Sequence, residues 1–300
     1  MIPAADRLQP TRIPRLGNAH DVELAARRIM EGLFHGRHRS RHTGSAIEFS
    51  DHRPYLAGDD LRAVDWKAYA RSDRLVVRRF QVERDLPLVI VIDASASMDY
   101  GEPRKADWAA LTTAVLSLLA IDQGDRVRVF NAGDTVQALV PHAGGPAQFM
   151  RICHAMAGLT WTSTGNFADH LRTIGRSCER RSLLVCLSDW LHDPVALQPA
   201  LAELAGRGHE IAAVQILDAS EVHLPAAWGR MLLRDPEGRV EPLACEATAA
   251  KAQYDDAIAA HIAAIRALLQ ASRGDHLLAQ TDADPAEVLG TWLRRRKRVA

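Results

Sequence analysis

The run LPLVIVID, at positions 86–93, limits the possible folds more than any other segment of the chain. Its apolar residues do not alternate with polar ones, which is typical of a parallel strand that helices cover on both faces. SLLVCLSD, at 182–189, has the same character, and EIAAVQILD, at 210–218, follows it. We therefore expect a mostly parallel sheet whose central strands are fully buried.

Helical patterns separate these strands. The sequence predicts helices at about 103–124, 145–156, 166–178, 194–205 and 247–271, and a closing helix at the C-terminus. Such alternation predicts a doubly wound α/β fold with three layers, Rossmann-like, and with right-handed crossovers.

Three regions differ in character. Residues 1–34 predict an irregular arm and a helix that follows Asn18. Residues 35–85 are rich in charge and glycine, and we expect a small N-terminal subdomain packed on the sheet. Residues 86–300 predict the α/β domain itself, with a hairpin insertion near 228–245.

Composition excludes several classes of function. Lys plus Arg equals Asp plus Glu, at 37 each, so the chain has no overall attraction to nucleic acid or to an anionic membrane. The four cysteines show neither CxxC nor disulfide spacing, and we expect them to be reduced and buried. No apolar stretch reaches the roughly 20 residues of a membrane helix. We expect a cytoplasmic protein that reaches the inner membrane only through a partner.

A metal-binding pattern follows the first buried strand. Asp93, Ser95 and Ser97 are separated by single alanines in the sequence DASAS. Ligands bind outside the carboxyl ends of the strands in open parallel sheets. One carboxylate and two hydroxyls are hard oxygen donors of low total charge, which suit Mg²⁺, with Mn²⁺ and Ca²⁺ as alternatives.

Two further loops are expected to converge on the same ion. Asp189 follows the second buried strand, and the loop 162–166 offers the hydroxyl of Thr164. An alignment based on the following helix would place Gly165, rather than Thr164, at the ligand position. Because these residues do not saturate the ion, a coordination position is left for an acidic side chain of another protein.

The residues also carry a family resemblance. DASAS matches the DxSxS pattern of von Willebrand factor A domains, and Asp189 falls where they place the acid of the third metal loop. EFSDHRPYLAGDDLRAVDWKAYAR, LVVRRFQVERDLPLVIVIDASASM and KADWAALTTAVLSLLAIDQGDRV resemble the bacterial family called domain of unknown function 58. Members are similar to von Willebrand factor A domains and are typically encoded beside MoxR-type AAA+ ATPases. The resemblance implies a non-enzymatic adaptor of such an ATPase, in chaperone-like maturation, envelope or stress functions.

Two other functions are weaker alternatives. A scaffold with a vestigial metal site would dock through the segment rich in His and Arg that includes His35, His38, His42 and His52. A magnesium-dependent phosphohydrolase would use Asp93 as its nucleophile, but the second acid of such enzymes is replaced by Ser95. The chain has neither GxxxxGK[ST] nor GxSxG.

Overall fold

The computed structural model describes residues 13, 15–34, 49–54, 68–69, 75–80, 86–162, 164–179, 181–238 and 240–299. The chain divides into two compact units, one formed by Met1–Arg37 with Leu86–Ala300 and the other by His38–Asp85. The smaller unit contains an antiparallel pair of strands, β1 (Phe49–Pro54) and β2 (Val76–Phe80). The elements described below belong to the larger unit.

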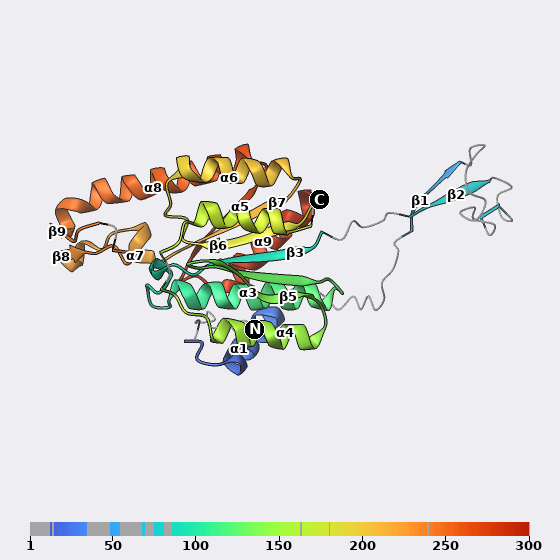
Figure 1. Cartoon of the computed structure of the whole chain (residues 1–300), viewed down its shortest axis with the longest axis horizontal. Helices are drawn as coiled ribbons and strands as arrows, with labels where there is room; N and C mark the ends of the chain where they lie inside the picture. Colours follow the sequence, from blue (N-terminus) through green and yellow to red (C-terminus); the bar gives the residue numbers. More distant parts are fainter. Residues whose placement is uncertain are drawn as a thin grey trace, which may run out of the picture. The chain divides into compact units, whose positions relative to one another are not determined.

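A six-stranded sheet forms the centre of the larger unit, in the order β10-β7-β6-β3-β4-β5. Neighbouring strands are parallel except that the edge strand β5 runs antiparallel to β4 (Figure 1). The strands are β3 (Leu88–Asp93), β4 (Val127–Ala132), β5 (Val136–Ala143), β6 (Leu183–Ser188), β7 (Glu210–Leu217) and β10 (Asp275–Gln280).

Helices cover both faces of this sheet. One hydrophobic cluster contains side chains of α1, α3, α4 and α9, and a second contains side chains of α5, α6 and α8. Figure 1 shows α3 and α4 on one side of the sheet and α5, α6 and α8 on the other. The protein therefore has a doubly wound α/β fold, as the sequence predicts. The helices are α1 (Ala19–Phe34), α3 (Lys105–Asp122), α4 (Pro146–Ala157), α5 (Phe167–Ser177), α6 (Pro194–Gly206), α7 (Ala219–Val222), α8 (Ala247–Ala271) and α9 (Pro285–Val299).

The side chains of β3 alternate between the two clusters. Ile90 and Ile92 join the cluster of α3, whereas Val89 and Val91 join the cluster of α5. All six residues of β3 are buried, which is why the sequence shows no polar alternation there. Burial of each apolar side chain of this strand contributes about 1.5–3 kcal/mol. The strand that leads to Asp93 is thus anchored in both cores.

Helix α3 begins later than the sequence predicts. We expected it to start near Pro103, but Arg104 has an extended backbone, with φ −68° and ψ 145°, and Lys105 is the first helical residue. The Arg104 side chain donates to the carboxylates of Asp99 and Asp107. This start places the Lys105 side chain at the end of α3 that lies next to the loop after β3.

The hairpin insertion lies between β7 and α8, where the sequence predicts it. Its strands are β8 (Arg230–Leu233) and β9 (Leu243–Glu246), and Leu233 pairs with Leu243. We expected the second strand over 239–244, and the observed one starts directly after Pro242. A proline nitrogen carries no hydrogen to donate to a strand partner.

Two further predictions concern the cysteines and the possibility of a membrane helix. All four cysteines are free, but only Cys153 and Cys186 are buried. The prediction of burial is wrong for Cys178 and Cys245, which are half-buried. Within the described ranges, no helix combines the length and the apolar character needed to span a bilayer.

Candidate metal centre

Two acidic residues lie at the carboxyl ends of adjacent central strands. Asp93 ends β3, and Asp189 comes directly after β6, the parallel neighbour of β3. From β3 the sheet grows in one direction through β4 and β5 and in the other through β6, β7 and β10. Open α/β sheets bind ligands at such a switch point. Both acids are buried, with 2% and 1% of their surface exposed.

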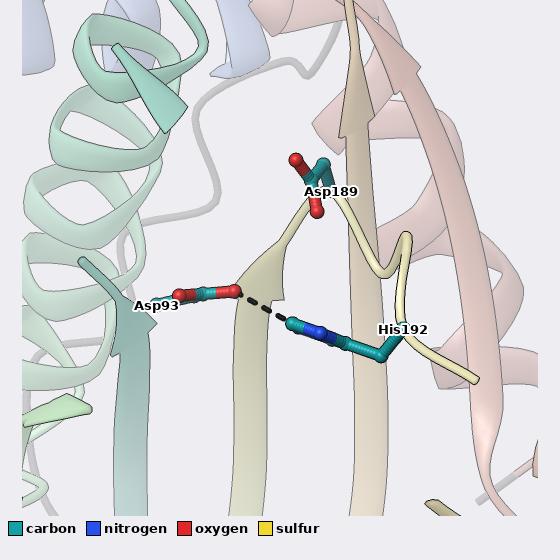
Figure 2. A group of neighbouring side chains, drawn as sticks. All are labelled: Asp93, Asp189 and His192. Atoms are coloured by element: carbon teal, nitrogen blue, oxygen red, sulfur yellow. Dashed lines mark hydrogen bonds and ion pairs between the residues drawn. The ribbon is translucent and has the colours of Figure 1, made fainter. Parts of the chain in front are cut away.

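The Asp93 carboxylate has polar partners on both oxygens. Oδ1 accepts a hydrogen bond from the backbone N–H of Ser95 at 3.0 Å, and Oδ2 accepts one from the hydroxyl of Ser188 at 2.6 Å. Nε2 of His192 lies 3.2 Å from the same Oδ2 (Figure 2). These contacts direct the Asp93 carboxylate toward the loop that follows β6.

The serine hydroxyls of the loop after β3 connect Asp93 with the second acid. Ser95 Oγ and Ser97 Oγ are 3.0 Å apart, and the Ser97 side chain helps to lower the pKa of Asp189. A single 3-10 turn, η2 (Ala96–Met98), follows Ser95 and contains Ser97. The loop after β3 therefore interacts with both acids.

A buried lysine also contacts the second acid. Nζ of Lys105 lies 3.0 Å from Asp189 Oδ2 and 2.6 Å from Glu221 Oε1, and the lysine side chain has no exposed surface. Burial lowers the pKa of Lys105, but Asp189 and Glu221 raise it by more, so the pKa lies above the usual value. Burial raises the pKa of Asp189, and Lys105 and His192 lower it by more. For Glu221, burial prevails and the pKa is raised.

The loop from Asp189 to His192 turns at a left-handed residue. Trp190 has φ 55°, a conformation that costs a non-glycine residue about 1–2 kcal/mol. Its buried ring meets Phe167 edge-on, with 5.5 Å between ring centroids, and Phe167 stacks on His192 at 5.1 Å. The aromatic contacts stabilise this turn and hold the imidazole beside Asp93.

Hydrogen bonds from two neighbouring strands hold the same loop. Gln215 of β7 donates from Nε2 to the backbone carbonyl of Asp189 at 3.0 Å. Its Oε1 accepts from Nε2 of His276, on β10, at 2.9 Å. Burial lowers the pKa of His276 to about 4, so the ring is neutral at neutral pH. The position of Asp189 thus depends on residues from two neighbouring strands, β7 and β10.

A pocket of about 270 Å³ opens beside His192, between the N-termini of α5 and α6. Thr164, Phe167 and Leu191 contribute to its wall. Thr164 is exposed, and its backbone N–H donates to Asp134 Oδ1 at 3.3 Å. The predicted ligand Thr164 therefore lies in the wall of this pocket.

Gly165 lies close to a neighbouring loop. A Cβ at this position would be 2.3 Å from the carbonyl oxygen of Gly133 and 2.4 Å from Cε1 of His170. The close approach explains a glycine here. Without a side chain, Gly165 has only its carbonyl oxygen to offer to an ion.

The gathered residues fit a divalent cation in donor type, spacing and charge. One ligand atom each of Asp93, Asp189 and His192 lie within 4.8 Å of one another. An octahedral ion with bonds of about 2.1 Å separates opposite ligands by about 4.2 Å, so a small closure suffices. Asp189 and Glu221 face the Lys105 ammonium and Asp93 faces His192, so the carboxylates outnumber the one ammonium. Burial lowers the pKa of His192, but Asp93 and Asp189 raise it by more. A metal ion that binds the ring would displace its proton.

Sequence reasoning found part of this group. Asp93, Ser95, Ser97 and Asp189 are brought together as the strand ends predict. Lys105, His192 and Glu221 were missed. His192 has a signal in the sequence, because it stands three residues after Asp189 and just before the Asp193-Pro194 start of α6.

A protein-family model identifies the family of the chain. The model described as "Protein of unknown function DUF58" matches residues 51–275, which is most of the chain. The chain belongs to this family.

Full-length relatives of this DUF58 protein occur in mycobacteria. An uncharacterized protein of Mycobacterium tuberculosis, Rv1480, is 28% identical over 293 residues, covering 96% of this chain and 92% of its own. An uncharacterized protein of Mycobacterium bovis, Mb1516, has the same identity and coverage.

Solved structures similar to the DUF58 protein include BatB from Bacteroides thetaiotaomicron, with a TM-score of 0.46 and 12% identity over 71% of this chain and 99% of that one. An aerotolerance-related membrane protein from Bacteroides fragilis has a TM-score of 0.48 and 12% identity, over 72% of this chain and 100% of its own. A von Willebrand factor type A protein from Catenulispora acidiphila has a TM-score of 0.42 and 14% identity. The match covers 74% of this chain and 42% of that one.

Proposed function

We propose that this DUF58 protein is a non-enzymatic interaction module that binds a partner protein through a divalent cation. The observation that supports this most is the meeting of Asp93 and Asp189, two buried carboxylates from adjacent strand ends, with the hydroxyls of Ser95 and Ser97 between them. Burying two carboxylates together is unfavourable unless cations or hydrogen bonds compensate them.

In this proposal Asp93, Ser95, Ser97 and Asp189 hold the ion, directly or through water. Mg²⁺ is the expected ion because all four donors are oxygens, and Mn²⁺ and Ca²⁺ are the alternatives. Thr164, in the wall of the neighbouring pocket, is the fifth proposed ligand. The ion would supply a coordination position for an acidic side chain of the partner, and the protein would contribute no reacting group of its own.

The proposed partner is a MoxR-type AAA+ ATPase, in chaperone-like maturation, envelope or stress functions. The family resemblance supports this partner. We propose a cytoplasmic location, in which contact with the inner membrane is made by the partner.

The test is affinity capture of the full-length protein from its own cell lysate, with Mg²⁺ or with EDTA. The variants are Asp93→Ala and the control Asp122→Ala, which removes an exposed carboxylate at the last residue of α3. Circular dichroism first establishes that both variants are folded. An AAA+ ATPase recovered with the wild type and the control in Mg²⁺, and lost in EDTA or with Asp93→Ala, supports the proposal. Capture that persists in folded Asp93→Ala overturns it.

One observation favours the scaffold as a second candidate. The ammonium of Lys105 already neutralises part of the acidic charge at Asp189, as a metal ion would. In that case the partner would dock on the segment rich in His and Arg, of which residues 35–48 lie outside the described part of the chain. Capture that survives EDTA and Asp93→Ala, but is lost when residues 35–55 are deleted, would favour this candidate.

A further inference from the structure

The imidazole of His192 faces the two acids of the candidate metal centre. Its Nε2 lies 3.2 Å from Asp93 Oδ2, and its side chain is 17% exposed. The ring is held by Phe167, whose plane is inclined to it by 20°. A side chain that is stacked in this way keeps its nitrogen in one place, so an ion would meet a preorganised donor.

The distances suit direct ligation better than a remote supporting role. Two adjacent ligands of an octahedral ion are about 3 Å apart when the bonds are about 2.1 Å. The separation of 3.2 Å between Nε2 and Oδ2 is close to that value. The third donor, Asp189, has a carboxylate oxygen within 4.8 Å of both other ligand atoms. Figure 2 shows the imidazole pointing at the Asp93 carboxylate, with Asp189 above the two side chains.

We propose that His192 is a direct metal ligand, so that the site binds a first-row divalent metal ion, Mn²⁺ or Zn²⁺, in preference to Mg²⁺ or Ca²⁺. This inference rests on the proposed metal-dependent function, and the added nitrogen donor changes the expected ion from Mg²⁺, which the four oxygen donors alone favour. A nitrogen donor favours ions such as Zn²⁺ over the hard ions Mg²⁺ and Ca²⁺, which take oxygen ligands. Mn²⁺ accepts both kinds of donor, since it shares the oxygen preference of Mg²⁺ but binds imidazole more strongly.

The alternative role for His192 is to donate a hydrogen bond to Asp93 and hold that carboxylate in place. Both roles predict weaker metal binding when the ring is removed. Only direct ligation places the nitrogen nucleus within bonding distance of the ion, and a spectroscopic measurement therefore separates the two roles.

The first experiment is a titration of the full-length protein with Mn²⁺, Zn²⁺, Mg²⁺ and Ca²⁺ separately, by isothermal calorimetry. The variants are His192→Gln, Asp93→Ala and the control His223→Gln, which changes an exposed histidine after α7. The wild type and the control are expected to bind Mn²⁺ and Zn²⁺ at least about 10-fold more tightly than Mg²⁺. His192→Gln is expected to lose this preference and to retain Mg²⁺ binding. Equal preference in His192→Gln and the wild type overturns the inference.

The second experiment is pulsed electron paramagnetic resonance of the Mn²⁺ complex. The wild type is expected to show coupling of the ion to an imidazole ¹⁴N nucleus, and His192→Gln to lack it. Coupling that persists in His192→Gln overturns the assignment.

The Asp93→Ala variant separates failure of this inference from failure of the proposed function. If it binds every ion as the wild type does, the metal-dependent function itself fails. If it loses all ions while His192→Gln behaves as the wild type, the function stands and only the role of His192 is wrong.

Discussion

The ammonium of Lys105 lies 3.0 Å from the carboxylate of Asp189, and no part of the lysine side chain is exposed. The two residues are 84 positions apart in the chain and belong to different elements, the start of α3 and the loop after β6. The site therefore contains a permanent positive charge next to one of its two acids. That charge both supports Asp189 and competes with any cation that binds there.

Removing this charge tests both effects. We expect Lys105→Met to lower the free energy of unfolding by about 3–5 kcal/mol, because Asp189 and Glu221 stay buried without their cation. We expect added Mn²⁺ to restore more of the stability in Lys105→Met than it adds to the wild type. Urea unfolding with and without the ion measures both.

The matched control for this variant is Lys251→Met. Lys251 is 39% exposed and pairs with Asp255, so its loss should cost less than about 1 kcal/mol. Equal losses in the two variants would show that the Lys105 pair is no more important than a surface pair.

The stacking of Phe167 on His192 predicts a separate effect on metal binding. Phe167→Leu keeps an apolar side chain but frees the imidazole, and we expect a loss of about 1–2 kcal/mol in stability with a roughly 10-fold weaker affinity for Mn²⁺. Phe149→Leu makes the same change in the other core, where the ring is equally buried. We expect it to lose similar stability and to keep its Mn²⁺ affinity. Mn²⁺ titration of both variants measures the difference, and an equal affinity would contradict the positioning role of Phe167.

Substitutions at two glycines with different surroundings are expected to affect the stability of the protein differently. Gly165→Ala would bring a Cβ within 2.3 Å of the Gly133 carbonyl oxygen, and we expect a loss of about 1–3 kcal/mol. Gly206, the last residue of α6, has no atom within 4 Å of such a Cβ. We expect Gly206→Ala to leave the stability unchanged or to raise it by up to about 1 kcal/mol. Chemical denaturation of both variants gives the comparison, and a neutral Gly165→Ala would mean that this loop moves freely.

The lowered pKa of His276 predicts part of the dependence of stability on pH. A histidine in an unfolded chain has a pKa of about 6.5, whereas burial lowers the pKa of His276 to about 4 in the folded protein. On acidification the unfolded chain binds this proton first. The contribution of the neutral ring is therefore complete above pH of about 6.5 and is lost as the pH falls to about 4, by up to about 3 kcal/mol.

The measurement is urea unfolding of the wild type and of His276→Gln at several pH values. We expect a weaker pH dependence in the variant between about 6.5 and 4. His170 and His209 also have lowered pKa values in both proteins, so the difference between the two curves isolates His276. Parallel curves would contradict the prediction.

The central strands could be predicted because an unbroken run of apolar residues indicates a buried strand. LPLVIVID and SLLVCLSD become β3 and β6, and the position of Asp93 and Asp189 at their ends follows directly. The start of α3 was harder to predict, because proline often begins a helix, whereas here Pro103 lies in a turn and Arg104 is extended.

The place of Lys105 and His192 in the site could not be predicted in the same way. A lysine in the first turn of a helix is usually solvated, and the burial of Lys105 depends on Asp189 and Glu221, which lie 84 and 116 positions away. His192 stands in a polar loop, where its orientation depends on the left-handed turn at Trp190 and on Phe167. Such long-range contacts leave no periodic pattern in the sequence.

The pairing of β3 with β6 has a mechanical consequence. The two strands are parallel and hydrogen-bonded from Leu88 with Leu183 to Ile92 with Leu187, and both end at the candidate centre. A partner that pulled on this centre along the strands would load the hydrogen bonds of the middle of the sheet in shear, so that they would resist together. The same pull on the edge strand β5 would load the hydrogen bonds to one neighbour only, because β4 alone flanks it. The candidate centre is thus attached to the part of the fold best able to withstand force.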